Sequence, residues 1–348
     1  MVRSLLLAII AAAALVGCQT ARAPASVGSQ TARPLASVGS LERLDPAFDA
    51  LVPRDARIEV LAEGFHWSEG PVWRRSGGYL LFTDVPGNTI YRWQEGEGLS
   101  VFLRPSGYSV GTAAPGREAG SNGLTFDAED RLVMADHGNR MVARLDEETF
   151  VKTPLAERYE GRRFNSPNDV VFNSRGDLFF TDPPYGLQGG LESPLRELEF
   201  SGVYRLSESG ELMLLDRELR FPNGITLSPD ERTLYVANSD PERAIIKAYD
   251  LRTDGTVAEG RVLFDATEGV RQGKKGLPDG LRADRSGNLF ATGPGGVLVI
   301  TPEGRHLGTI ETGQATANVT FGDDGSTLYM TAHSYLMRIR TSTRGAGF

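Results

Sequence analysis

The stretch Ser166–Gly186, SPNDVVFNSRGDLFFTDPPYG, places a Pro-Asn-Asp corner directly before a short apolar strand pattern. A polar turn follows, and then a second apolar strand pattern that ends at Asp182. Asn and Asp are common in turns because their side chains bond to nearby backbone and tolerate unusual dihedral angles. A single corner of this kind would be an ordinary turn, so its meaning depends on whether the pattern recurs.

The pattern occurs six times along the chain. Each copy has a polar corner, a short strand, a turn rich in Asp, Asn or Gly, and a second apolar strand. The corner residues follow one another at intervals of 39 to 56 residues, at Glu69, Asn122, Asn168, Asn223, Asp279 and Asn318. A period of about 50 residues with strand signals in every unit predicts a β-propeller rather than a helical solenoid.

Further strand patterns complete the repeats. Segments such as 89–104 and 244–266 each supply two more strands, and four strands form one propeller blade. The last repeat lacks its outer strand, whereas Ile58–Glu63, IEVLAE, precedes the first corner and belongs to no other repeat. We therefore predict an all-β protein, a six-bladed β-propeller with four-stranded blades over residues 41–348. Pairing of Ile58–Glu63 with the C-terminal strand would close the ring.

The N-terminal sequence predicts export. Arg3 and an apolar run from Leu5 to Val16 precede Gly17 and Cys18. This run is too short to span a bilayer, which requires roughly 20 residues, so residues 1–17 form a predicted signal peptide. The sequence ending at Cys18 resembles a bacterial lipobox, which predicts a lipid anchor at Cys18 and a location in the periplasm or outer membrane. A plain secretory signal is the alternative. Residues 18–40, rich in Ala, Ser, Gly and Pro, are predicted to form a disordered tether.

Composition excludes some classes of partner. The formal net charge of −8 argues against a nucleic-acid partner, which would favour a basic surface. Cys18 is the only cysteine, so the chain can form no intrachain disulfide. The predicted contact with a membrane is through the lipid anchor alone, and the sequence does not determine the oligomeric state.

The propeller geometry predicts that the corners meet. The innermost strand of a blade and the next strand run in opposite directions, so each corner lies beside the end of the second strand, at one mouth of the central channel. Six polar corners would then surround the axis. The alternative is that the corners are tight turns that require positive φ, which applies above all to Asn122 and Asn318.

Four of the corners are suitable ligands for one divalent cation, because they offer oxygen donors and two negative charges: Glu69, Asn168, Asn223 and Asp279. Carboxylate and amide oxygens favour Ca²⁺ first, with Mg²⁺ and Mn²⁺ as alternatives. Zinc is the weaker candidate because structural zinc sites use cysteine and histidine, and the four histidines are scattered.

Five motifs together resemble the senescence marker protein/gluconolactonase/luciferin-regenerating enzyme family: SEGPVW at 68–73, SPNDVVF at 166–172, TDPPYGL at 181–187, FPNGITLS at 221–228 and LPDGL at 277–281. The resemblance covers about residues 65–340. It implies a six-bladed propeller with one divalent metal at the channel mouth, and a hydrolase of sugar lactones. By motif it assigns metal ligation to Glu69, Asn223 and Asp279, with Asn168 as a further ligand or a substrate contact.

Lactone hydrolysis requires a polarised carbonyl, a delivered water and a stabilised oxyanion. Asp279 is the predicted general base. Activation of the water by the cation itself is the competing mechanism, and the sequence does not separate the two.

Other polar residues are candidates for substrate binding. His137 and Arg140, beside Asp136, follow a second strand, so they could orient a sugar hydroxyl or the developing carboxylate; packing at a loop corner is the alternative. Asn122 is a candidate as a corner residue, and Tyr185 could stack on a sugar-like ring. The long connections 106–120 and 183–200 are candidate substrate walls.

Three functions therefore compete. The leading prediction is a metal-dependent lactonase acting on a small sugar lactone such as gluconolactone. An esterase or organophosphate hydrolase on the same site is the second. The third is a non-catalytic propeller that binds a sugar acid or a protein. Two carboxylates at axial corners favour catalysis, whereas a scaffold would not require them.

Overall fold

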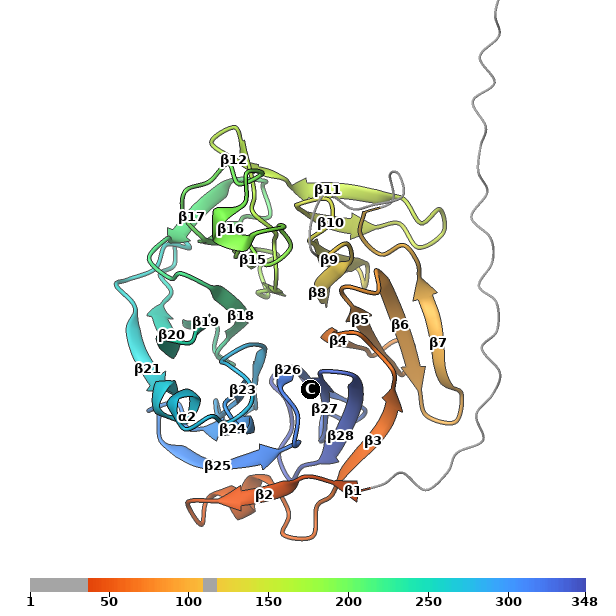
Figure 1. Ribbon diagram of the computed structural model, residues 1–348, viewed down its shortest axis with the longest axis vertical. Helices are drawn as coiled ribbons and strands as arrows, with labels where there is room; N and C mark the ends of the chain where they lie inside the picture. The colour runs from red at the N-terminus through yellow and green to blue at the C-terminus, as the bar shows by residue number, and fades with distance from the viewer. Residues whose placement is uncertain (1–36, 109–117) are drawn as a thin grey trace, which may run out of the picture.

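The computed structural model describes residues 37–108 and 118–348, which form a ring of β-sheets around a central axis (Figure 1). Six sheets are arranged as blades, each starting with a strand near the axis and continuing outward. The predicted all-β six-bladed propeller is confirmed. The predicted signal peptide, Cys18 and the tether up to residue 36 lie outside the described residues, as do residues 109–117 of one candidate substrate wall.

All blades are antiparallel sheets. Blade 1 consists of β4 (Ser68–Arg74), β5 (Tyr79–Asp84), β6 (Thr89–Gln94) and β7 (Gly98–Leu103). Blade 2 consists of β8 (Ser121–Phe126), β9 (Leu132–Asp136), β10 (Met141–Leu145) and β11 (Lys152–Ala156). Blade 3 consists of β14 (Val170–Phe172), β15 (Leu178–Asp182), β16 (Gly202–Leu206) and β17 (Leu212–Asp216).

The second half of the chain repeats this arrangement. Blade 4 consists of β18 (Pro222–Leu227), β19 (Thr233–Asp240), β20 (Arg243–Asp250) and β21 (Arg261–Asp265). Blade 5 contains β22 (Leu281–Ala283), β23 (Leu289–Gly293), β24 (Gly296–Ile300) and β25 (His306–Glu311). Blade 6 contains β26 (Thr316–Gly322), β27 (Thr327–Ala332), β28 (Tyr335–Arg340) and, as its predicted closing strand, β3 (Ile58–Glu63).

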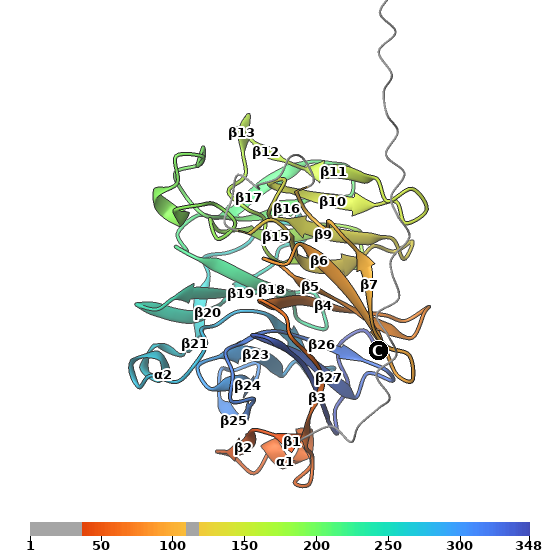
Figure 2. The same ribbon diagram turned by 45° about the vertical axis from the view of Figure 1, so that its right-hand side comes forward.

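The ring closes as predicted, because β3 pairs antiparallel with β28 in a register that sets Tyr335 opposite Glu63. Two strands at the start of the described chain were not predicted. β1 (Ser37–Val38) extends blade 6 beyond β3, and β2 (Ser40–Arg43) extends blade 5 beyond β25, so these two sheets have five strands rather than four. Figure 2 shows both at the lower edge of the ring.

The predicted end of the tether at residue 40 is therefore wrong, because residues 37–40 belong to the β-structure. Composition alone suggested disorder, but Val38 and Leu41 pack against the buried cluster between blades 5 and 6. Between the two strands, Gly39 has φ +70°, and a Cβ there would come within 1.9 Å of the Glu311 carbonyl oxygen. Each strand satisfies the open edge of a blade, which otherwise leaves backbone groups unpaired.

Little helix is present in the described part of the chain. α1 (Phe48–Leu51) buries Phe48 against blades 5 and 6, α2 (Thr267–Arg271) follows blade 4, and a 3₁₀ turn covers Gly190–Glu192. A small hairpin, β12 (Arg158–Tyr159) and β13 (Arg162–Arg163), links blades 2 and 3. None of the described helices combines the length and the apolar character needed to cross a bilayer.

The hydrophobic core lies between the blades. Six buried clusters each join the facing sides of two neighbouring blades, as where Val133 of blade 2 meets Phe180 and Tyr204 of blade 3. Aliphatic and aromatic side chains here lose their contact with water, which provides the main force that holds the blades together. The ring therefore fixes the axial strands from their outer sides and holds the corner residues in place.

Candidate functional site

The six innermost strands contact one another in the order β4, β8, β14, β18, β22, β26 and back to β4, so the corners at their starts converge. In four of these strands the pairing register shifts at the corner, between Glu69 and Val72 for example. A β-bulge of this kind bends the strand and changes the direction of a side chain. In blades 3 and 5 the corner precedes the strand. The backbone at the corners therefore leaves the regular strand pairing, and the corner side chains can point toward the axis.

The glycine that follows a corner is needed for close approach between blades. A Cβ at Gly224 would lie 2.1 Å from the Asp279 carbonyl oxygen, and one at Gly280 would lie 1.9 Å from Asn318 Cγ. Gly70 has φ +48°, whereas Gly224 and Gly280 do not have positive φ. The tight-turn alternative therefore explains at most part of the pattern, because the chains also have to crowd together at the axis.

The aspartates that end several second strands have a structural function. The Asp84 carboxylate accepts hydrogen bonds from the backbone N–H groups of His66 and Trp67, both at 3.1 Å. Asp182 accepts the N–H groups of Asn165 and Ser166, both at 2.8 Å. These carboxylates tie down the chain as it enters blades 1 and 3, so they hold the corners Glu69 and Asn168 at the channel mouth.

Two corner carboxylates, the buried Glu69 and the half-buried Asp279, lie at the axis. Burial raises the pKa of Glu69 to about 8, and the nearby Asp169 carboxylate adds to this rise. Burial also raises the pKa of Asp279 well above its usual range, and repulsion from Glu69 contributes. Asp279 Oδ1 is buried and has no hydrogen-bonding partner among the described residues. Two such carboxylates would be stabilised by a cation between them.

Hydrogen bonds position both the carboxylates and the amides. Glu69 Oε2 accepts the Gly70 N–H at 2.9 Å and the Asn318 amide N–H at 3.2 Å. The Asn223 amide donates to Ser239 Oγ at 2.9 Å, and this hydroxyl donates in turn to the Pro278 carbonyl at 2.6 Å. Ser239 therefore connects the corner of blade 4 with the corner of blade 5.

The other two amide corners are also buried. Asn168 is fixed through its backbone, with its N–H bonded to the Thr181 carbonyl and its own carbonyl accepting the Gly123 N–H, both at 2.8 Å. Asn122 Oδ1 is buried without a hydrogen-bonding partner in the described part of the chain. Both therefore belong to the same ring of polar corners as the carboxylates.

The donors fit a hard divalent cation better than zinc. Within residues 37–108 and 118–348, no group of three or more His, Cys, Asp or Glu side chains is arranged to hold a metal ion. The predicted set has two carboxylates, and its other members are asparagines. The unpartnered oxygen of Asp279 and the raised pKa values of Glu69 and Asp279 are features that a positive charge at this point would offset. Amide and carboxylate oxygens are typical ligands of Ca²⁺.

The sequence interpretation missed three groups near this set. Asp169, directly after Asn168, is fully buried and lies 3.8 Å from Arg282 Nη1 across the ring. Burial raises the pKa of Asp169, and the Arg282 charge opposes the rise. Glu118 adds a further negative charge that raises the pKa values of both Glu69 and Asp279. The sequence did contain a signal for Asp169, because an acidic residue follows the corner in PND where four other repeats have glycine. No sequence pattern pointed to Glu118.

Tyr185 lies next to the axial residues. Its ring stacks on Phe221 with centroids 5.6 Å apart and an interplanar angle of 12°. Burial raises the pKa of the Tyr185 phenol, hydrogen bonding to Ser239 and Asn223 opposes this rise, and the Asp279 charge adds to it. Its predicted place beside the corners is therefore consistent with the geometry, although its ring face is used by Phe221.

His137 and Arg140 lie in different surroundings. His137 is buried, with Nδ1 2.9 Å from Glu118 Oε2. Arg140 Nε donates to the Phe164 carbonyl at 2.7 Å, and its pKa is lowered by burial and then by the nearby Arg163. Arg140 Nε also donates to the Asn165 carbonyl at 3.2 Å, and its Nη1 lies 3.9 Å from Glu197 Oε1 in the 183–200 connection. Arg140 therefore contacts two connections of blade 3 and not the axial corners.

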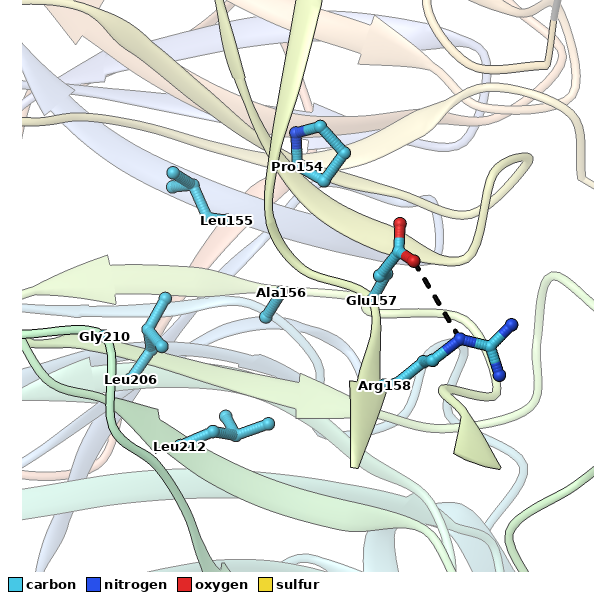
Figure 3. Close-up of a pocket in the computed structure, with 8 residues that line it drawn as sticks. All are labelled: Pro154, Leu155, Ala156, Glu157, Arg158, Leu206, Gly210 and Leu212. Carbon is cyan, nitrogen blue, oxygen red and sulfur yellow. Dashed lines mark ion pairs between the residues drawn. The ribbon is translucent and has the colours of Figure 1, made fainter. Parts of the chain in front are cut away.

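A pocket of about 420 Å³ lies away from the axis, between the outer strands of blades 2 and 3 (Figure 3). It is lined by Pro154 and Leu155 of β11 and by Leu206 and Leu212 of blade 3, and at its rim Glu157 and Arg158 are 3.9 Å apart. None of the corner residues lines it. We therefore place the candidate site at the axis, where the corner carboxylates converge.

Fold and site together define a propeller with a polar, acidic axial centre. The chain belongs to the SMP-30/Gluconolactonase/LRE-like family, because residues 67–334 match the sequence model of that family. It is 41% identical over 309 residues to a gluconolactonase of Zymomonas mobilis, covering 88% of this chain and 87% of that protein.

Solved structures agree with this assignment. A gluconolactonase of Xanthomonas campestris is similar at 31% identity and a TM-score of 0.77, covering 90% of this chain and 99% of that one. A regucalcin of Agrobacterium tumefaciens, described as a calcium-binding protein, is similar at 20% identity and a TM-score of 0.64, covering 83% of this chain and 94% of that one. This last likeness concerns the fold alone.

Proposed function

We propose that the protein hydrolyses a sugar lactone of the gluconolactone type to the sugar acid, with one divalent cation held by Glu69, Asn223 and Asp279 and with Asn168 as a further ligand or substrate contact. Ca²⁺ is the first candidate, and Mg²⁺, Mn²⁺ and Zn²⁺ are the alternatives. The similarity to a gluconolactonase over most of both chains supports the substrate class.

One observation carries the proposal: the buried Glu69 and the half-buried Asp279 repel each other at the axis, and Asp279 presents a buried, unpartnered oxygen. A purely structural axis would be more stable with neutral or apolar groups, because burying unpaired charge is costly. The same arrangement suits a reaction that needs a cation and a proton acceptor at one point.

Hydrolysis joins a water oxygen to the lactone carbonyl carbon and breaks the bond from that carbon to the ring oxygen. In the proposed mechanism Asp279 takes the proton of the attacking water and returns a proton to the departing ring oxygen. The bound cation would polarise the carbonyl and offset the negative charge on its oxygen. Asn318 and Gly70 hold Glu69 in place, and Ser239 holds Asn223 beside Asp279.

The proposal includes a location. The N-terminal sequence supports export to the bacterial periplasm or outer membrane with a lipid anchor at Cys18. The enzyme would then meet lactones outside the cytoplasm.

The test is a panel of lactones, simple esters and an organophosphate, followed by titration of the released acid at constant pH. Chelator-treated protein is compared with the same protein after each of the four cations is restored. We expect sugar-lactone hydrolysis that is lost on chelation and returns with Ca²⁺. Hydrolysis of esters alone would favour the second function, and binding of a sugar acid without turnover of any substrate would favour the non-catalytic alternative.

A further inference from the structure

Glu118, which is half-buried, and the buried His137 form a pair that the proposed mechanism does not use. His137 follows β9, its side chain is fully buried, and its Nδ1 lies 2.9 Å from Glu118 Oε2. A carboxylate can only accept here, so the contact assigns the Nδ1–H tautomer to His137, and in that tautomer Nε2 is an acceptor.

His137 Nε2 is buried and has no hydrogen-bonding partner among the described residues. Leaving a buried polar atom unpaired is unfavourable, and such atoms in native proteins usually bond to the protein or to an ordered water. An unpaired acceptor on a ring that is fixed from its other nitrogen therefore indicates a partner that is not part of the polypeptide.

Contacts between loops place this pair in the wall of the axial site. The Glu118 N–H is bonded to the Gly186 carbonyl at 3.5 Å, and a Cβ at Gly186 would lie 2.9 Å from the His137 Cβ. Gly186 directly follows Tyr185, which lies beside Asn223 and Asp279. The Glu118 charge also acts on Glu69, Asp279 and Tyr185, so its carboxylate is within electrostatic range of all three.

Resting on the proposed function, we propose that His137 is a specificity-determining residue whose Nε2 accepts a hydrogen bond from one hydroxyl group of a polyhydroxylated lactone. Glu118 is the positioning residue that holds the imidazole in the required tautomer. An acceptor fixed in a buried wall selects for a hydroxyl and against a hydrogen at that position, because the deoxy compound leaves the nitrogen unpaired.

The experiment measures kcat and KM for glucono-1,5-lactone and its monodeoxy analogues with the cation-loaded protein. The unaltered protein should hydrolyse one deoxy analogue less efficiently than glucono-1,5-lactone. The expected difference in kcat/KM is about 2- to 13-fold, the ratio that one neutral hydrogen bond gives. In His137→Phe the discrimination at that one position should disappear, with the change mainly in KM. Comparing substrate and residue changes together isolates the single contact.

Further variants separate positioning from folding. Glu118→Gln keeps an oxygen that can accept the Nδ1 proton, so it should keep the discrimination, whereas Glu118→Ala should lose it. His333→Gln is the matched control: His333 follows the second strand of blade 6, but it is exposed and bonds to Ser334 Oγ at 2.7 Å. This control should retain both activity and discrimination. If His137→Phe fails to fold, as judged by thermal melting, Glu118→Ala carries the same prediction.

The outcomes are distinct. Discrimination that stays unchanged in both His137→Phe and Glu118→Ala, or equal losses on gluconolactone and every deoxy analogue, would overturn the inference and leave the proposed function intact. Failure of the unaltered, cation-loaded protein to hydrolyse any lactone would reject the proposed function itself.

Discussion

Cation binding should release protons, because Glu69 is protonated in the metal-free protein. With a pKa of about 8, its carboxyl group carries about 0.9 of a proton at pH 7. A cation can use only the ionised form, so binding must displace that proton. Affinity should then fall about fivefold between pH 8 and pH 7 and about tenfold between pH 7 and pH 6, or about 50-fold over the two pH units. If Asp279 also loses a proton, the affinity should depend on pH more steeply.

The assay is a calorimetric titration of chelator-treated protein with Ca²⁺, in pairs of buffers that have the same pH and different enthalpies of ionisation. The dependence of the measured heat on the buffer gives the number of protons released. We expect about one or two protons per ion at pH 7 in the unaltered protein, and about one fewer in Glu69→Gln. Glu268→Gln, on the exposed side of α2, should behave like the unaltered protein.

The pH dependence of thermal stability gives an independent test of the raised pKa of Glu69. The folded, metal-free protein holds the Glu69 proton up to about pH 8, whereas the unfolded chain loses it near the ordinary glutamate pKa of 4.5. The unfolded state therefore binds fewer protons between these values, and the free energy of unfolding contributed by Glu69 decreases as the pH rises through this window. Glu69→Gln should remove this part of the decline. A Ca²⁺ affinity equal at pH 6 and pH 8, with heats independent of buffer, would refute the reasoning.

Three further predictions concern roles, ring closure and location. Extra cation should restore part of the activity of Glu69→Gln, whereas Asp279→Asn should stay about 10²–10⁴-fold low if Asp279 moves the proton; equal restoration would reduce Asp279 to a ligand. Ile58→Ala, in the buried start of β3, should lower the free energy of unfolding by about 2–4 kcal/mol in denaturant titrations, while Val262→Ala on an exposed part of β21 should change it by less than about 0.5 kcal/mol. Similar losses in the two variants would contradict the importance of the closing strand. Cys18→Ser should move the protein from the membrane fraction to the soluble fraction with its lactonase activity unchanged, and an unaltered protein found soluble and without lipid would favour the plain secretory signal.

The local pattern of the sequence was sufficient to predict the blades. Strand and turn signals are encoded over a few residues, and their repetition identified the corners from Glu69 to Asn318. The missing outer strand of the last repeat and the unassigned Ile58–Glu63 together predicted the closure that β3 and β28 form. Composition was less informative at the boundary, because the short segment 37–40 becomes β-structure only where the edges of blades 5 and 6 are available to it.

The tertiary structure alone decided how the polar groups meet. Asp169 and Arg282 are more than a hundred positions apart in the sequence, yet they lie 3.8 Å from each other, and Glu118 reaches His137 from a separate connection. No local signal encodes such pairs, because they depend on the distance between blades and on the closeness allowed by glycines such as Gly280. The altered pKa values arise in the same way, since burial and the repulsion between carboxylates exist only once the ring has closed. The sequence by itself thus determined which residues form the corners. The folded ring determined which of them interact electrostatically, which have raised pKa values and which are in close contact.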